Sequence, residues 1–310
     1  MMQAAVLRLF RIAGSCALGV VLSAAQSAPR LLTPMYPYKL KLDPYVPSPG
    51  RAMGVMLKTR INGGRPLRLI LDSGAEHLVI SREIAKATGL APIADLAMIG
   101  FGRKSEGSAQ IAVAKWVDVG PLAFEDCPVD IMDRRVVAGA DGVVPLSLFS
   151  DFLVRLDFPG RVLDLMPYSE AGDAPDGFVH VRSIRAALFV ETRLNGSHNG
   201  YFLLDTGAAH NALSSMAAQE LGGPGVNART RMVQGAGGVS EVQAMNSRVR
   251  FGVAKQEIVS DDVVLVNLDN LSRHNGLNVA GLLGYPALRR YVVTVNYRDS
   301  LVRMEESAAE

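Results

Sequence analysis

The sequence contains an internal repeat, which constrains the fold more than any single motif does. The segment "LILDSGAEHLVIS" at 69–81 returns as "FLLDTGAAHNALS" at 202–214. Placing Asp72 over Asp205 sets an offset of 205 − 72 = 133 residues. An internal repeat of this kind predicts two copies of one structural unit.

Further matches extend the repeat along both halves. At the same offset "LKTRING" at 57–63 lies over "VETRLNG" at 190–196. "FLVRLDFPGRVLDL" at 152–165 lies over "YVVTVNYRDSLVRM" at 291–304, at an offset of 139. We assign the net insertion of 139 − 133 = 6 residues to a loop, because loops accept insertions at little entropic cost.

Each half predicts the same order of elements. A β-hairpin turning at Asn-Gly leads to an apolar strand that ends in Asp-Ser/Thr-Gly, and a short helix begins near Ser81 or Ser214. A Gly-rich hairpin, more strands and a closing hairpin follow, so we expect a mainly β fold. The predicted segments are a signal peptide at 1–25, a proline-rich segment at 26–53, a first lobe at 54–165, a linker at 166–177, a second lobe at 178–305 and a disordered tail at 306–310.

The N-terminus predicts export. Arg8 and Arg11 precede a short apolar stretch, and Ser23 and Ala25 are small residues placed for cleavage after Ala25. A retained anchor helix is the alternative. With a cleaved signal the protein is expected in the periplasm or outside the cell. Cys127 then stands alone, which excludes an intrachain disulfide.

Composition bounds the class of protein. The chain has 310 residues, of which 49% are hydrophobic and 20% charged, so it is globular and long enough for two lobes with their own cores. A net charge of +2 gives no strong field that would indicate nucleic acid or an acidic membrane surface as a partner.

The two Asp-Ser/Thr-Gly-Ala turns, each completed by a downstream apolar segment, resemble those of the aspartic proteases. The chain is most similar to retropepsin-like bacterial members, duplicated into one chain as in the bilobal pepsin-like enzymes, over about residues 54–305. The resemblance implies two homologous acid-protease β-barrel lobes with short helices. It also implies an aspartic endopeptidase that acts on peptides or unfolded proteins without a cofactor or metal. Because one chain carries both halves, we expect a monomer.

The chemistry of the pair supports this resemblance independently. Two carboxylates about 3 Å apart cannot both ionise, so the pair supplies a base and an acid together. We therefore expect Asp72 and Asp205 to activate water between them and to be the catalytic residues. A lone Asp in such a turn usually caps it, but two in register favour catalysis.

The neighbours of the two aspartates are expected to support them. Gly74 and Gly207 allow a tight backbone where the two turns meet. In the family's pattern, the hydroxyls of Ser73 and Thr206 lock the turns together below the dyad.

Ala75 and Ala208 follow the two turns, where pepsin-like relatives usually place Ser. A hydroxyl at these positions can donate to a carboxylate and lower its pKa. Without these donors, we expect the singly protonated pair to persist to higher pH and the pH optimum to be mildly acidic.

Two Gly-rich hairpins at 98–107 and 233–242 occupy, in the resemblance, the position of flaps that close over a peptide. Plain hairpin turns are the alternative. The candidate flap or substrate-binding residues are Gly100, Phe101, Gly102, Gly235, Ala236 and Gly237.

One position departs from the family's pattern. The second half has Leu282-Leu283-Gly284, as the pattern requires, but the first has Val143-Val144-Pro145. Pro removes an N–H donor, so the support behind Asp72 is expected to differ from that behind Asp205. Pro145 is the best argument for an alternative function, a non-catalytic peptide-binding pseudoprotease of the cell envelope. A purely structural envelope protein is the second alternative.

His77 and His210 also repeat at the offset of 133. Neither has a carboxylate or thiol at ligand spacing, so we interpret both as polar residues behind the active-site turns and predict no metal site.

Overall fold

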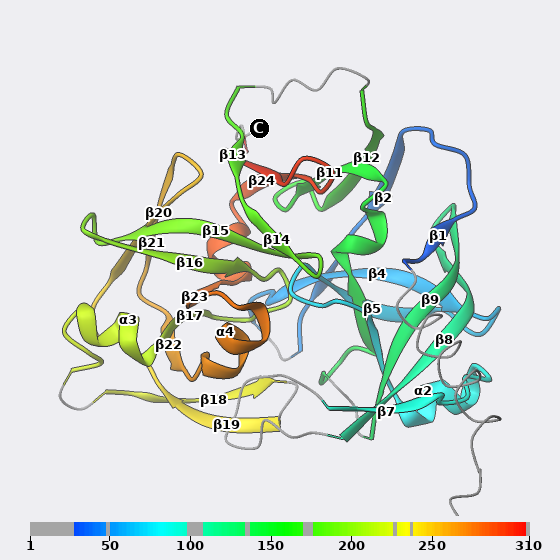
Figure 1. The fold of residues 1–310 in the computed structure, drawn as a ribbon, viewed down its shortest axis with the longest axis horizontal. Coiled ribbons are helices and arrows are strands. Elements are labelled where there is room, and N and C mark those ends of the chain that lie inside the picture. Colours follow the sequence, from blue (N-terminus) through cyan, green and yellow to red (C-terminus); the bar gives the residue numbers. More distant parts are fainter. Residues whose placement is uncertain are drawn as a thin grey trace, which may run out of the picture.

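The computed structural model describes residues 28–47, 50–97, 108–133, 137–169, 176–225, 228–235 and 238–307. Strands dominate and the helices are short, which confirms the predicted mainly β class. Two sheet-rich lobes lie side by side, the first on the right of Figure 1 and the second on the left, and a further sheet joins them at the top. The predicted signal segment lies outside the described residues.

The first lobe is built on a nine-stranded sheet. Its strands, in spatial order, are β1 (Arg30–Leu31), β9 (Leu122–Met132), β6 (Leu78–Ser81), β10 (Gly142–Pro145), β5 (Leu67–Asp72), β4 (Gly54–Ile61), β8 (Ser108–Val119) and β7 (Ala94–Ala97), with β3 (Asp43–Tyr45) paired to β4.

The second lobe repeats this plan with an eight-stranded sheet. The order is β21 (Gln256–Ser260), β20 (Val249–Val253), β15 (Ala187–Leu194), β16 (His198–Leu204), β23 (Val279–Leu283), β17 (Asn211–Ser214) and β22 (Val263–Val266), with β14 (Arg182–Ile184) paired to β15. A separate hairpin of β18 (Thr230–Gly235) and β19 (Gly238–Gln243) completes the lobe.

Strands from both halves form the six-stranded sheet that joins the lobes. Its order is β13 (Val179–His180), β25 (Leu301–Glu306), β24 (Tyr291–Asn296), β11 (Phe152–Asp157), β12 (Val162–Pro167) and β2 (Tyr38–Lys41). The two predicted closing hairpins are β11–β12 and β24–β25, and they meet through antiparallel pairing of β11 with β24. β12 extends two residues into the segment for which we predicted a linker, and β25 extends one residue into the predicted tail.

The helices follow the repeat as well. The two predicted helices are α2 (Arg82–Ala87) and α3 (Ser215–Glu220). Ser81 and Ser214 cap them, because each hydroxyl accepts a hydrogen bond from a first-turn N–H. The other helices in the described residues are η1 (Leu146–Phe149), α4 (Asp269–Asn275) and α5 (Tyr285–Leu288). Within the described part of the chain, no helix is long and apolar enough to cross a bilayer.

In each lobe one strand passes between the two strands that flank the active-site turn. β10 pairs in parallel with β5 and antiparallel with β6, and β23 does the same with β16 and β17. Gly142 and Gly281 occupy the crossing, where an added Cβ would lie 2.1 Å from the Val79 carbonyl oxygen and 2.3 Å from that of Ala212. Only glycine lets the strands approach this closely.

This crossing generates a prediction about stability. Gly142→Ala is expected to lower the free energy of unfolding by about 1–3 kcal/mol, because the new methyl group meets backbone that cannot move aside. Gly252→Ala is the matched control, since its nearest neighbour, the Arg193 side chain, would lie at an ordinary 3.5 Å. Urea unfolding of both variants compares the two positions, and equal stability would contradict the close approach.

Candidate active site

The fold brings the two repeated aspartates together. Asp72 is the last residue of β5, and Asp205 directly follows β16, so both lie where an apolar strand ends. Their carboxyl groups hydrogen-bond to each other. Asp205 is 8% exposed and Asp72 is half-buried, so the pair is largely withdrawn from solvent.

Below the carboxyl pair, four hydrogen bonds cross from lobe to lobe. The Ser73 N–H donates to Thr206 Oγ1 at 3.0 Å, and the Thr206 N–H donates to Ser73 Oγ at 3.1 Å. Each hydroxyl then donates onward to the opposite lobe, Ser73 to the Leu204 carbonyl and Thr206 to the Leu71 carbonyl, both at 2.7 Å. Both side chains are buried. We call this arrangement the crossed hydroxyl lock.

Gly74 and Gly207 make room for the carboxyl groups. A Cβ on Gly207 would lie 2.4 Å from Asp72 Oδ2, and a Cβ on Gly74 would lie 3.1 Å from Asp205 Cγ. Neither glycine has a positive φ. We expected a requirement for a tight backbone, but the structure shows that the requirement is for space. Each carboxyl group fills the volume that a side chain would occupy on the opposite turn.

The electrostatics of the pair favour one retained proton. Burial raises the pKa of both carboxyl groups, and the negative charge of Asp72 and the hydrogen bond to it raise the pKa of Asp205 further, well above its usual range. Backbone amides of Gly74, Ala75 and Gly207 favour the ionised form of Asp72 and partly offset the effect of burial on its pKa. The pair is therefore expected to retain one shared proton to higher pH than an ordinary carboxyl group would.

The departure at Pro145 is compensated within the first lobe. In the second lobe, the Gly284 N–H donates to Oδ1 of fully buried Asn211 at 3.0 Å. In the first lobe, Pro145 pairs with Asp72 and has no N–H, and Leu78 stands at the position equivalent to Asn211 (211 − 133 = 78). A donor and its acceptor have thus been lost together, which leaves no buried polar group unpaired. Pro145 also has φ −69°, the value its ring prefers.

The two repeated histidines each lie beside a carboxylate that the sequence did not reveal. His77 Nδ1 is 3.0 Å from Asp130 Oδ1, and His210 Nδ1 is 3.4 Å from Asp262 Oδ2. The contact with His210 is the main reason why the pKa of Asp262 is lowered. Asp130 and Asp262 are not equivalent in the repeat, so no offset could have found them. Among the described residues, no group of three His, Cys, Asp or Glu could hold a metal ion.

The predicted flap residues are only partly within the described structure. Gly235 ends β18, but Gly100, Phe101, Gly102, Ala236 and Gly237 lie outside the described residues. The β18–β19 hairpin runs along the lower edge of the second lobe in Figure 1. Val233 and Val242 on its inner face pack against the apolar cluster of that lobe. The hairpin is therefore anchored on the lobe that carries Asp205.

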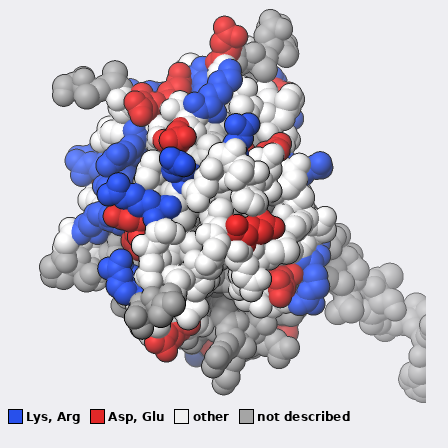
Figure 2. All heavy atoms as spheres, turned by 90° about the vertical axis from the view of Figure 1, so that its left-hand side faces the viewer, with Lys and Arg blue, Asp and Glu red and all other residues white. Residues whose placement is uncertain are grey.

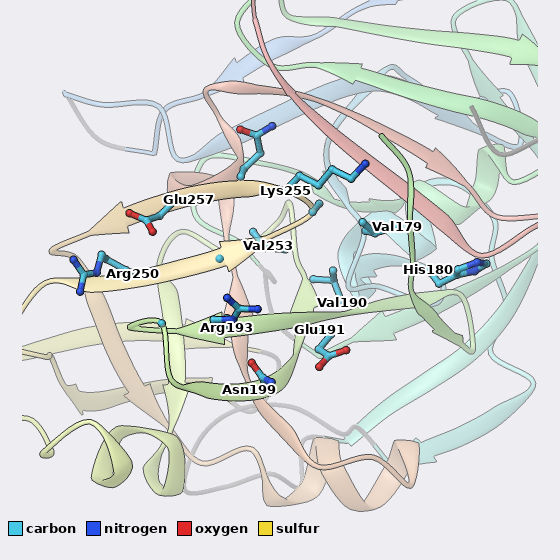
Figure 3. Close-up of a pocket in the computed structure, with 14 residues that line it drawn as sticks. Val179, His180, Val190, Glu191, Arg193, Asn199, Arg250, Val253, Lys255 and Glu257 are labelled. Atoms are coloured by element: carbon cyan, nitrogen blue, oxygen red, sulfur yellow. The ribbon is translucent and has the colours of Figure 1, made fainter. Parts of the chain in front are cut away.

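A separate groove of about 650 Å³ lies on the second lobe, away from the aspartates. Figure 3 shows its charged side chains arriving from β15 and the β20–β21 hairpin. Arg193, Arg250 and Lys255 are balanced in part by Glu191 and Glu257. The mixed charges give this groove no convergent chemistry comparable with that of the paired carboxyl groups.

Comparisons with known proteins agree with this geometry. The model of a family described as aspartyl protease matches residues 57–149 and 190–287, one match in each half of the repeat. The crystal structure of the aspartic proteinase from Irpex lacteus has a similar fold, with a TM-score of 0.53 and 11% sequence identity over 88% of this chain and 98% of that chain. No protein with curated annotation matches the sequence.

The crossed hydroxyl lock predicts a measurable cost for a near-isosteric change. Thr206→Val leaves the Leu71 carbonyl and the Ser73 N–H without partners, at about 1–3 kcal/mol of unfolding free energy for each group. Thr59→Val is the matched control, because the Thr59 hydroxyl is buried and has no hydrogen-bond partner among the described residues. Chemical unfolding should show a large loss for Thr206→Val and little or none for Thr59→Val. Similar losses in both would mean that the lock does not stabilise the fold.

The raised pKa of Asp205 predicts how stability depends on pH. A raised folded-state pKa contributes stability that is present below the ordinary Asp value of 3.8 and is lost as pH rises through the folded value. Asp205→Asn removes this contribution. The variant should therefore gain stability relative to the wild type between about pH 4 and about pH 7, by about 1.4 kcal/mol for each unit by which the pKa is raised.

Asp262→Asn is the control of opposite sign for this pH prediction. The pKa of Asp262 is lowered, so its contribution is present above 3.8 and is lost as pH falls through the folded value. The variant should therefore be less stable than the wild type, by more at about pH 7 than at about pH 3. Urea unfolding across this range measures both variants. If the difference in unfolding free energy between Asp205→Asn and the wild type did not change with pH, the result would contradict a buried pair that shares a proton.

Proposed function

We propose, because the chain belongs to the aspartyl protease family, that it is an aspartic endopeptidase which hydrolyses peptide bonds with water activated between Asp72 and Asp205. The observation that carries this proposal is the pair of hydrogen-bonded carboxyl groups fixed by the crossed hydroxyl lock. The substrates we infer are peptides and unfolded proteins, as membership of the aspartyl protease family suggests.

In the mechanism we propose, Asp72 begins as the base and Asp205 as the acid. The ionised Asp72 takes a proton from water as the water oxygen attacks the peptide carbonyl carbon, and Asp205 gives its proton to the carbonyl oxygen. The resulting tetrahedral diol collapses as the C–N bond breaks. The departing nitrogen takes the proton from Asp72, and a diol hydroxyl returns a proton to Asp205. The pair ends in its starting state.

The raised pKa values of the pair support this division of roles. An acid must keep its proton at the working pH, and burial together with the charge of Asp72 raises the pKa of Asp205. The mildly acidic optimum expected from Ala75 and Ala208 stays a prediction. It agrees in direction with raised pKa values, because the singly protonated state then persists to higher pH.

The pseudoprotease alternative lost its main support at Pro145. That alternative relied on Pro145 lacking the N–H that Gly284 provides in the second lobe. The equivalent of Asn211 in the first lobe is the apolar Leu78, which needs no such donor. Both aspartates, both hydroxyls and both glycines of the turns are in place. We therefore favour the catalytic function.

We also propose that one chain suffices for activity and that the protein works in the periplasm or outside the cell. The first proposal rests on the duplication, since both aspartates come from one chain. The second rests only on the signal sequence expected at residues 1–25. Light scattering at assay concentration and detection of the mature N-terminus after secretion are the corresponding tests.

Replacing either aspartate tests the proposed mechanism. Asp72→Asn and Asp205→Asn should each lower kcat/KM by about 10⁴-fold or more, and the double variant should be little worse because the two groups act as one unit. Cleavage of a diverse peptide mixture, read by mass spectrometry with and without pepstatin, measures this. Asp151→Asn, at an exposed Asp outside the site, is the control and should keep wild-type activity. Substantial turnover by either single variant would contradict the shared mechanism.

A further inference from the structure

We propose that Arg51, Arg231 and His210, gathered around Asp262, form a subsite that binds a carboxylate of the peptide substrate. This inference rests on the proposed function and names a substrate class for it: peptides that present an acidic side chain, or their own C-terminal carboxylate, beside the Asp205 turn. We call these residues the Asp262 cluster.

Three elements meet in the Asp262 cluster. Arg51 comes from the β3–β4 connection of the first lobe, and its Nη2 lies 3.7 Å from Asp262 Oδ2. Arg231 comes from β18, and its Nη2 lies 3.6 Å from Asp262 Oδ1. His210 Nδ1 lies 3.4 Å from Asp262 Oδ2. One carboxylate thus holds two guanidinium groups and an imidazole at the place where the first lobe, the second lobe and the β18–β19 hairpin converge.

The Asp262 cluster is attached to the active-site turn. Asp262 directly precedes β22, whose Val263 pairs with Asn211 of β17, the residue after His210. Asn211 binds the Gly284 N–H with its oxygen and donates from Nδ2 to Ser260 Oγ, which also accepts from the Asp262 N–H. A short chain of hydrogen bonds therefore runs from the strand end behind Asp205 to Asp262.

Arg51 reaches the Asp262 cluster across the junction of the lobes. The start of β4, directly after this connection, lies against the second active-site turn, since a Cβ on Gly54 would lie 3.8 Å from the Thr206 carbonyl oxygen. Arg231 lies on the same face of its hairpin as Val233, which packs against the lobe. The two guanidinium groups therefore reach Asp262 from different elements, one from the first lobe and one from the hairpin.

The charges of the Asp262 cluster do not balance. Two arginines and one aspartate give +2 − 1 = +1 with His210 neutral, and more when it is protonated. The contacts with Asp262 are longer than ordinary hydrogen bonds, and Asp262 Oδ1 and His210 Nδ1 are buried without a hydrogen-bond partner among the described residues. The Arg51 and Arg231 side chains are 53% and 43% exposed. Their spare N–H groups can bind an incoming carboxylate through charge-assisted, bidentate hydrogen bonds.

The opposite side of the aspartate pair has different charges. There, Glu76 follows the first active-site turn, His274 of α4 lies 3.6 Å from its carboxylate, and Arg185 contacts His274. With His274 neutral, this group carries no net charge (−1 + 1 = 0). A substrate carboxylate is therefore attracted to the Asp205 side of the site rather than to the Asp72 side.

Surface charge alone does not identify this subsite. Lys and Arg are common on the end of the second lobe that Figure 2 shows, where Asp and Glu are interspersed with them. Arg51 and Arg231 differ from such residues because both contact one partly buried carboxylate that is tied to the active-site turn. That convergence of two cations is the feature an isolated surface arginine lacks.

The test compares matched peptides on the wild-type protein. One series carries Glu or Gln at each position in turn around a cleaved bond, and a second carries a free-acid or an amidated C-terminus. We expect kcat/KM to favour Glu over Gln at one position, or the free acid over the amide, by about 10-fold, and we expect high salt to reduce this ratio. The series that shows the preference identifies the source of the carboxylate.

Variants connect this preference to the Asp262 cluster. Arg51→Gln and Arg231→Gln should each bring the ratio toward one, and Arg231→Glu should favour Lys or Arg at the same position. Arg250→Gln removes the same charge from the distant groove of Figure 3 and should keep the wild-type ratio. A wild-type ratio of one at every position and at the C-terminus, or a ratio that none of the cluster variants changes, would overturn the inference.

A binding measurement separates this inference from the proposed function. Asp205→Asn keeps the Asp262 cluster, so fluorescence anisotropy of the labelled Glu and Gln peptides on this variant reports the preference without turnover. If no peptide is cleaved by the wild type but the acidic peptides bind more tightly to Asp205→Asn, the proposed catalysis fails and the subsite stands. If peptides are cleaved but acidic and neutral ones bind equally, the subsite fails and the catalysis stands.

Discussion

The crossed hydroxyl lock is the interaction on which the rest of the site depends. Two buried hydroxyls, from Ser73 and Thr206, satisfy four backbone groups across the junction of the lobes. Because unpaired buried groups are costly, the two turns have one low-energy way to meet. That meeting brings two carboxyl groups into a volume that glycine leaves free, and burial then makes full ionisation unfavourable. The lock, the space and the shared proton form one chain of cause and effect.

The repeat in the sequence predicted the order of elements well. The hairpins that turn at Asn-Gly, the two capped helices and the closing strands lie where the matched segments indicated, since local patterns and caps determine them. The two aspartates and the two hydroxyl neighbours are brought together as expected. The role of Gly74 and Gly207 was harder to foresee, because a requirement for space appears only when both turns are in view.

The contacts that the sequence could not predict are those in which the halves differ. The second lobe places an acceptor, Asn211, opposite the Gly284 N–H. The first lobe has Leu78 and Pro145 at the equivalent positions and so lacks both the acceptor and the donor. Either replacement alone would leave a polar group unpaired, so each makes sense only together with the other. Asp130 and Asp262 contact the two histidines but do not occupy equivalent positions in the repeat, so the offset between the halves predicts neither contact. Duplication in one chain permits such divergence. Arg51 and Arg231 can then give one side of the site a charge that the other side lacks.

The proposed chemistry requires Asp72 and Asp205 to share one proton in the folded protein. Carboxyl carbon NMR of the protein labelled with ¹³C-aspartate, titrated with pH, measures this most directly, and Asp72→Asn and Asp205→Asn assign the two signals. We expect two coupled titration steps, one of them well above the ordinary value of 3.8, with both signals responding to each step. Two independent titrations near 3.8 would contradict it.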